Sequence, residues 1–356
     1  MRLWWLLGPG IAIAAAAPAT RPALVVHVGN DPAALHRFEA WLGCPVDGVG
    51  VYGGQADWAD WSGSIGYELG LWRAAHRRLY WSIPLIPEGA SLANAARGDF
   101  DRRYAAAAAA IAAGTPGTAP ILIRTGWEFN TPYMPWAAAG HEAAFVGAWR
   151  HFVGAFRHAS PRFRFEWTPN LGGDEDPARA YPGDGVVDVI GMDAYYNTRW
   201  DSTDAARAWR HNVERRYGLA WLEGFAAAHR KPTAYSEWGV MADGAGPYVA
   251  AAAAWFAGHR TVYQAYWDSD STFPGKLSTG RLPHAGAAYR AAFGRCRGVS
   301  QAQSVRPERS RRAGAPCAST SLSTNGWRVR SAGVDSSADH RRSSRQRAPG
   351  ATIAAR

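Results

Sequence analysis

Residues 121–130 read ILIRTGWEFN, a short apolar run followed closely by a carboxylate and an amide. Residues 232–240 read PTAYSEWGV and repeat the pattern, with Glu237 after the apolar run. Runs of this length between turn-forming residues are typical of buried strands. The two stretches therefore predict two strands, each with a carboxylate near its C-terminal end.

The rest of the chain extends this pattern. From Ala23 to about Phe293, short apolar runs alternate with longer stretches of helical period, as in repeated βα units. The runs are Ala23–Val28, Gly48–Tyr52, Leu79–Leu85, Pro120–Arg124, Phe163–Thr168, Val187–Met192, Pro232–Ser236 and Thr261–Trp267. Eight strands in one series predict an α/β fold, a (β/α)8 TIM barrel, in preference to an open doubly wound sheet. No glycine-rich nucleotide-binding loop occurs in the sequence.

Two helices can be predicted with their ends. Residues 31–42 begin at Asp31, a plausible N-cap, and stop at Gly43. Residues 141–156 carry an aromatic stripe at helical spacing, which predicts a face packed on the barrel. The members of the stripe are Phe145, Trp149, Phe152 and Phe156.

The positive charge is unevenly distributed. The 356 residues carry a formal charge of +10. Eleven arginines and three acids give residues 299–356 a charge of +8, which leaves +2 for residues 1–298. A nearly neutral body argues against a nucleic-acid partner. The 18 tryptophans exceed what a core normally needs and suit stacking on flat ligand faces such as sugar rings.

Composition divides the chain into three parts. Residues 1–20 have Arg2, an apolar run and small residues at a cleavage site, which predicts a signal peptide and a secreted or periplasmic protein; a short membrane anchor is the alternative. No integral membrane segment is expected after cleavage. Residues 21–297 are the predicted barrel, and the Arg- and Ser-rich residues 298–356 a disordered tail. Cys44 and Cys296 could form a disulfide, which the sequence does not establish.

Two glutamates are the candidate catalytic residues. Glu128 and Glu237 follow the fourth and seventh strands, where a parallel barrel places its reactive groups. One carboxyl kept protonated by apolar surroundings and one ionised are what glycosidic cleavage requires. The histidines show no metal-ligand spacing, so neither a metal nor a cofactor is expected.

The motifs resemble glycoside hydrolase family 26, the β-mannanase-like retaining glycosidases. They are RTGWEFNTPYMPW (124–136), FEWTPN (165–170), YPGDGVVDVIGMDAYY (181–196), SEWG (236–239) and AYWD (265–268). The resemblance implies Glu128 as acid/base and Glu237 as nucleophile. It makes Tyr195 similar to a tyrosine that hydrogen-bonds the nucleophile, and Trp267 similar to the aromatic floor under the sugar. Trp127 departs from the histidine that precedes the acid/base in the typical mannanase.

Further residues are expected in or around the site. Trp127, Asn130 and Trp136 are expected to bind the substrate, with Trp136 on the leaving-group side. Asn130 and Asn170 could donate to sugar hydroxyls or stabilise turns. Arg124 is expected inside the barrel, bridging a carboxylate or tuning Glu237. Glu166 is interpreted as the ion-pair partner of Arg164, and Asp193 as a loop anchor. Four aromatic residues are expected either to line distal subsites or to pack at the rim of the barrel: Tyr52, Trp58, Trp61 and Trp81.

These observations predict a monomeric retaining endo-acting β-glycoside hydrolase of the β-1,4-mannanase type, with a polysaccharide or oligosaccharide substrate. Two alternatives remain open. The enzyme could cleave another β-glycan or a bacterial exopolysaccharide, because Trp127 replaces the expected histidine. The barrel could also bind carbohydrate without catalysis.

Overall fold

The fold is taken from a computed structural model, which describes residues 21–173 and 175–294. Within these residues, eight parallel strands close into a barrel in chain order, and β8 pairs with β1. The predicted (β/α)8 barrel is therefore confirmed. The strands are β1 Ala23–His27, β2 Gly48–Tyr52, β3 Arg78–Ile83, β4 Ile121–Thr125, β5 Phe163–Trp167, β6 Val189–Tyr196, β7 Thr233–Val240 and β8 Thr261–Trp267.

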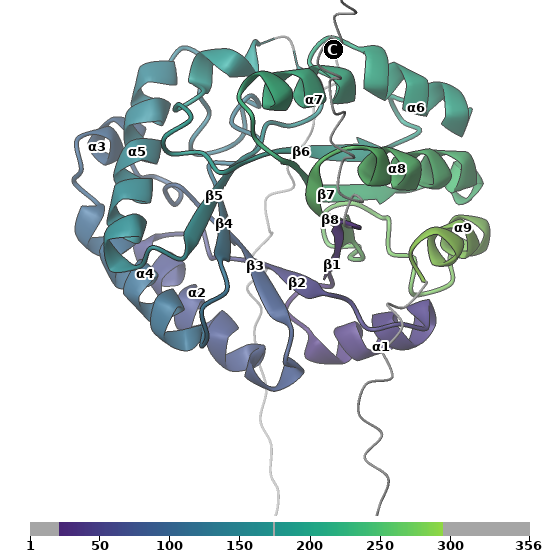
Figure 1. The fold of residues 1–356 in the computed structure, drawn as a ribbon, viewed down its shortest axis with the longest axis horizontal. Helices are drawn as coiled ribbons and strands as arrows, with labels where there is room; N and C mark the ends of the chain where they lie inside the picture. The colour runs from purple at the N-terminus through teal and green to yellow at the C-terminus, as the bar shows by residue number, and fades with distance from the viewer. Residues whose placement is uncertain (1–20, 174, 295–356) are drawn as a thin grey trace, which may run out of the picture. The chain divides into compact units, whose positions relative to one another are not determined.

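Helices surround the ring of strands, as Figure 1 shows in a view along the barrel. They are α1 Pro32–Leu42, α2 Trp58–Leu71, α3 Leu92–Ala96, α4 Asp101–Gly114, α5 Glu142–Ala159, α6 Ala205–Glu214, α7 Leu219–Ala228, α8 Gly246–Gly258 and α9 Pro283–Phe293. Three short 3-10 turns, Arg73–Ala75, Pro177–Ala180 and Asp243–Ala245, complete the described secondary structure.

The two helices predicted in detail form where expected. The Asp31 side chain caps α1 by accepting from the Ala33 N–H, and Gly43 ends it at a φ of 81°. Glycine adopts the left-handed conformation at the end of a helix easily, because it has no Cβ to clash. The four aromatic residues of the α5 stripe are all fully buried. Burial of such side chains contributes about 1.5–3 kcal/mol each, which holds α5 on the barrel.

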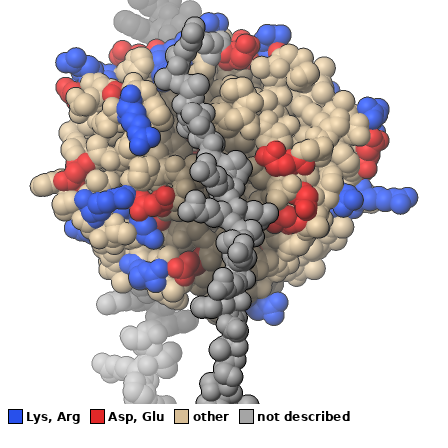
Figure 2. Space-filling model, turned by 180° about the vertical axis from the view of Figure 1, so that it is seen from behind, with Lys and Arg blue, Asp and Glu red and all other residues tan. Residues whose placement is uncertain are grey.

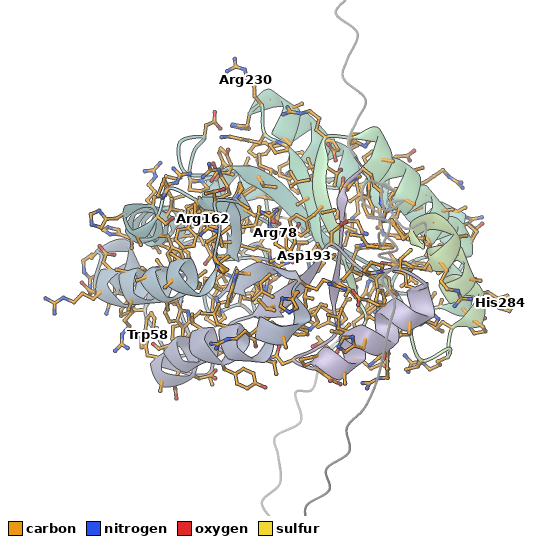
Figure 3. All side chains as sticks on the ribbon, turned by 60° about the horizontal axis from the view of Figure 1, so that its bottom comes forward. Trp58, Arg78, Arg162, Asp193, Arg230 and His284 are labelled. Atoms are coloured by element: carbon orange, nitrogen blue, oxygen red, sulfur yellow. The ribbon has the colours of Figure 1, made fainter. Side chains whose placement is uncertain are left out.

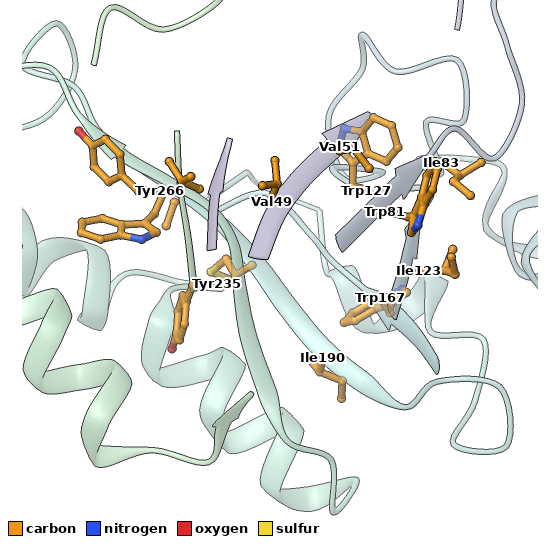
Figure 4. Packing of buried hydrophobic residues seen from close by; sticks show 14 of the residues in the cluster. Val49, Val51, Trp81, Ile83, Ile123, Trp127, Trp167, Ile190, Tyr235 and Tyr266 are labelled. Carbon is orange, nitrogen blue, oxygen red and sulfur yellow. The ribbon is translucent and has the colours of Figure 1, made fainter. Parts of the chain in front are cut away.

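The core has two layers. The larger lies between strands and helices, where Figure 4 shows side chains of β2, β3 and β4 packed together, including Val49, Ile83 and Ile123. The smaller is an apolar cluster formed by alternate residues inside the barrel, such as Val25, Leu122 and Tyr263. Toward the C-terminal ends of β4 to β7, the buried residues include Arg124, Glu166, Asp193 and Glu237, so this end of the barrel is polar inside.

Strands β6 and β7 extend farther than the sequence predicts. The apolar runs predict ends at Met192 and Ser236, yet the pairing continues, with Asp193 opposite Glu237 and Tyr196 opposite Val240. Charged residues rarely continue a buried strand unless they are paired, and here Arg124 pairs with both carboxylates. Glu237 therefore lies within β7 and not after its end.

The described surface is mixed in charge. On the face shown in Figure 2, lysine and arginine side chains are interspersed with acids among uncharged residues. Within the described ranges, no helix is both long and apolar enough to cross a membrane. The predicted signal peptide and tail lie outside the described residues. Cys44 is disulfide-bonded, and both other cysteines also lie outside those residues.

Candidate active site

Glu128 lies in the loop that follows β4 in a strained backbone conformation. Its φ is 52°, a region that costs a residue with a Cβ of the order of 1 kcal/mol or more. Two backbone hydrogen bonds hold it there: its N–H donates to the Thr168 carbonyl at 2.8 Å, and its carbonyl accepts from the Thr131 N–H at 2.9 Å. The Asn170 amide donates to Oε1 of Glu128. The loop thus fixes one carboxyl against the end of β5.

Glu237 presents its carboxylate from β7 to two donors. The Arg124 guanidinium donates to Oε1, and the Tyr195 hydroxyl donates to Oε2 at 2.8 Å. Both of its oxygens therefore have partners, and the donor from Arg124 is charged. Glu128, in contrast, has a neutral amide on one oxygen. The two glutamates differ in their surroundings, as glycosidic cleavage requires. The Tyr195 contact is the one that the resemblance implied.

Arg124 is the centre of a buried ion-pair cluster. It is almost fully buried in β4 and also donates to Oδ1 of Asp193 at 2.9 Å. Its guanidinium carbon lies 5.0 Å from the ring centroid of Trp127 and 5.5 Å from that of Tyr52. Figure 3 places Asp193 near the middle of the barrel, far from labelled surface residues such as His284. Asp193 is thus a strand residue paired with Arg124, and the predicted loop-anchoring role is wrong.

Replacing Arg124 with glutamine should destabilise the protein strongly, because Asp193 would be left buried without its cation. We expect the free energy of unfolding to fall by about 3–5 kcal/mol at pH 7. Burial raises the pKa of Asp193, and Arg124 opposes that shift. Without Arg124, the folded-state pKa of Asp193 would lie still farther above the unfolded one than in the wild type, so the loss should grow as pH rises. Urea unfolding at pH 5 and pH 8 measures it.

The matched control is Arg164→Gln on the adjacent strand, where the guanidinium is exposed and donates only to backbone carbonyls. It should lose less than about 1 kcal/mol. An equal loss in the two variants would contradict the cluster's importance.

Burial raises the pKa of Glu128 to about 7, and the negative charge of Glu237 adds to the shift. The Asn170 hydrogen bond, Arg124 and a hydrogen bond from Tyr133 act in the opposite direction. A carboxyl that stays protonated near neutral pH can donate a proton to a leaving group.

Glu166 does not pair with Arg164, so that prediction is wrong. Its carboxyl lies inside the barrel and accepts from the hydroxyls of Thr168 at 2.8 Å and Tyr263 at 2.5 Å, and from Ser236. Arg164 points toward solvent at the N-terminal end of β5, so the two side chains lie at different depths. Glu166 therefore belongs to a buried hydrogen-bond network below Arg124 and Glu237.

Aromatic rings border the two glutamates. Trp267, at the end of β8, stacks on His27 with centroids 4.1 Å apart, and its Nε1 is buried without a hydrogen-bond partner among the described residues. Tyr52 contacts both rings edge-on. Trp127 is only 6% exposed, since it packs on Tyr52 and Trp136. Trp267 is thus the more accessible platform, and Trp127 offers little of its surface.

Two predicted sugar contacts bond other parts of the protein. Trp136 is 0% exposed and donates through Nε1 to the Trp127 carbonyl at 2.6 Å, so we give it a packing role. Asn130 uses its amide to bond the backbone of Asn170 and Gly172, which ties the loops after β4 and β5 together. Trp61 and Trp81 are likewise buried in the core, and Trp58 is half-buried beneath Arg103.

Sequence reasoning missed three residues that act directly on the glutamates. Asn170 and Tyr133 bond Glu128, and Tyr52 interacts with Glu237. Asn170 was considered only as a sugar contact or a turn residue, and Tyr52 only as a distal one. Tyr133 lies in the quoted motif, but no sequence pattern singles it out. Its side chain is 66% exposed in the structure.

Two clefts flank the pair. The larger, of about 420 Å³, adjoins Glu128 through Tyr133 and Asn170, touches the Glu237 partner Tyr195, and continues over the loop after β6 to Trp200. The smaller, of about 330 Å³, adjoins Glu237 through Tyr52 and reaches Tyr67 on α2. The large hydrophobic side chains that are exposed in the described residues are Tyr67, Tyr133 and Trp200, and all three line these clefts.

A closed (β/α)8 barrel with one buried glutamate in the loop after β4 and another on β7, next to clefts lined by exposed aromatic rings, is the arrangement of a glycoside hydrolase. Residues 104–220 match the model of glycosyl hydrolase family 26, which confirms the predicted resemblance over the segment that holds the motifs at 124–136, 165–170 and 181–196. The matched segment contains Glu128, Asn170 and Tyr195 and ends before Glu237.

Solved structures of low sequence identity share the fold. A family 26 β-mannanase from Bacteroides ovatus is 13% identical, with a TM-score of 0.51 over 78% of this chain and 90% of that chain. An endo-β-1,4-mannanase from Cellulomonas fimi is 17% identical, with a TM-score of 0.50 over 76% of this chain and 71% of that chain. A family 26 protein from a Muricauda species is 14% identical, with a TM-score of 0.52 over 75% and 88%. No curated protein sequence matches the chain significantly.

Proposed function

We propose that this protein is a retaining, endo-acting β-glycoside hydrolase, with β-1,4-mannan as the first candidate substrate. The observation that carries the proposal is the unequal environment of the two glutamates. Glu237 accepts from Arg124 and Tyr195, whereas the pKa of Glu128 is raised to about 7. One group is therefore suited to attack and the other to donate a proton.

In the proposed first step, Glu237 attacks the anomeric carbon while Glu128 protonates the departing glycosidic oxygen, which leaves a glycosyl-enzyme ester on Glu237. In the second step, Glu128 takes a proton from water, and that water displaces Glu237 with a second inversion at the same carbon. Configuration is retained overall. Tyr195 and Arg124 hold the attacking carboxylate in place through both steps.

Endo action is supported by the clefts on both sides of the pair. A chain-end enzyme needs only one extended subsite region, whereas here about 420 Å³ adjoins Glu128 and about 330 Å³ adjoins Glu237. Each volume has an exposed tyrosine or tryptophan on which a pyranose ring can stack. A polysaccharide could then lie across both glutamates, with sugars on either side of the cleaved bond.

The pH dependence tests the role of Glu128. Because the acid must be protonated, we expect kcat/KM to fall as pH rises through about 7. The Asn170 hydrogen bond lowers the pKa of Glu128, so Asn170→Ala should move this alkaline limb to higher pH. Initial rates with an aryl glycoside between pH 4 and pH 9 measure both. An alkaline limb that stays in place in Asn170→Ala would contradict the assignment.

Substrate choice is tested by reducing-sugar release from mannan, glucomannan, xylan and mixed-linkage glucan. Faster sugar release from mannan than from the other polymers supports the proposal of a β-mannanase. Release only from another β-glycan or an exopolysaccharide favours the second candidate, which Trp127 motivates. No release from any polymer, together with equal aryl-glycoside background for wild type and Glu237→Ala, would favour a carbohydrate-binding barrel without catalysis.

We further propose that the enzyme acts outside the cytoplasm, on the basis of the leader-like composition of residues 1–20. Fractionation of expressing cells and N-terminal sequencing of the product would detect cleavage after Ala15, Ala17 or Ala19; an uncut cytoplasmic protein would contradict it.

A further inference from the structure

The cleft beside Glu128 contains an arginine that forms no ion pair within 4.0 Å with any acid of the described residues. Arg215 follows α6 and lines this cleft with Trp200 and Asn212. No carboxylate within the described residues lies within 4.0 Å of its guanidinium, whereas Arg37, Arg97 and Arg281 all pair with acids. Its charge is therefore available to a ligand in the cleft.

The backbone makes room for this guanidinium. A Cβ on Gly172 would lie 2.5 Å from Nη2 of Arg215, and Gly172 has a φ of 89°. The side chain thus packs directly against the turn after β5, which the Asn130 amide also fixes. A side chain held in this way loses less entropy when it binds an anion than a free surface arginine does.

Other groups in the cleft suit a sugar ring. Trp200 is 72% exposed, so one face of its indole is open to a pyranose. An exposed aromatic face beside a cationic side chain in a cleft is typical of a carbohydrate subsite, where stacking fixes the ring and polar groups read its substituents.

The charges of the cleft favour an acidic sugar. Asp193 is paired with Arg124, and the Asp201 carboxyl accepts from the Asn197 N–H while burial raises its pKa. The charge of Arg215 lowers the pKa of Asp201, so the two groups interact across the cleft, but they form no ion pair within 4.0 Å. A neutral hexose would use the guanidinium only through weak hydroxyl contacts, whereas a carboxylate could form two parallel hydrogen bonds with it.

We propose that this cleft is a leaving-group subsite for a hexuronate, with the sugar ring on Trp200 and its carboxylate on Arg215. The inference rests on the proposed function for the direction of the glycan, since Glu128 protonates the oxygen of the leaving group. It narrows the substrate to a β-glycan that carries acidic sugars on that side of the cleaved bond.

The test is calorimetric binding of two matched tetrasaccharides, β-1,4-linked mannuronate and mannotetraose, which differ only in whether carbon 6 is a carboxylate. The full-length Glu237→Gln protein prevents turnover. A charge-assisted contact is worth about tenfold or more in affinity, so mannuronate should bind at least about tenfold more tightly at low salt. Adding Arg215→Gln should remove that preference and leave mannotetraose within about twofold.

Two further variants separate this site from general attraction of anions. Arg216→Gln removes the neighbouring arginine, which bonds the Tyr217 hydroxyl, and should keep the preference. Trp200→Ala should weaken both tetrasaccharides. Equal affinity for the two sugars, or equal effects of Arg215→Gln and Arg216→Gln, would overturn the proposal. Because binding needs no turnover, lack of hydrolysis would refute the proposed function and leave this result standing.

Discussion

Glu237→Ala is expected to lose nearly all activity, with kcat on an activated aryl glycoside reduced by about 10⁴-fold to 10⁶-fold. Removal of a nucleophile abolishes the covalent step, and losses of this size are seen when a covalent catalyst is deleted. The variant should remain folded, because Arg124 keeps its ion pair with Asp193. Initial rates, with thermal unfolding as the check on folding, measure the effect.

Azide distinguishes the loss of a nucleophile from a general loss of function. Azide can occupy the space of the deleted Glu237 carboxylate and attack the anomeric carbon in a single displacement. The product should be a glycosyl azide of inverted configuration, which NMR identifies. The control is Glu142→Ala at the start of α5, where Glu142 is half-buried and pairs with the exposed Arg179; this variant should keep wild-type activity without azide. A Glu237→Ala rate within about tenfold of wild type would rule out the assigned role.

Glu128→Ala should give the second largest effect, and one that depends on the leaving group. Without an acid, departure of a sugar alcohol should slow by about 10²-fold to 10⁴-fold. A dinitrophenyl leaving group needs no protonation, so the glycosyl-enzyme on Glu237 should form and then accumulate. Intact-protein mass spectrometry would detect this ester, and the alkaline limb near pH 7 should disappear.

Azide again supplies the diagnostic product. In Glu128→Ala it would attack the glycosyl-enzyme, so the glycosyl azide should have retained configuration, opposite to that from Glu237→Ala. If the two variants give the same configuration, or if the two configurations are exchanged, the roles assigned to the glutamates are wrong.

The sequence predicted the barrel because its signals are local. Eight short apolar runs and intervening helical periods are visible without any knowledge of long-range contacts, and the cap at Asp31 and the α5 stripe were predicted for the same reason. The ends of β6 and β7 were missed. The last residues of the two strands are stabilised by pairing with each other and with Arg124. Arg124 is 113 residues away from Glu237 in the sequence.

The sequence by itself therefore determined the (β/α)8 barrel, the two glutamates and the family resemblance, since all three are written in short runs and motifs. Only the tertiary structure decided which side chains act on those glutamates. Closure of the barrel brings Arg124, Tyr52 and Asn170 to them from three different strands or their loops. It also buries Trp136, a predicted sugar contact, and leaves Trp200 exposed. Burial and pairing depend on contacts between distant segments, and these contacts give two otherwise identical carboxyls different electrostatic surroundings.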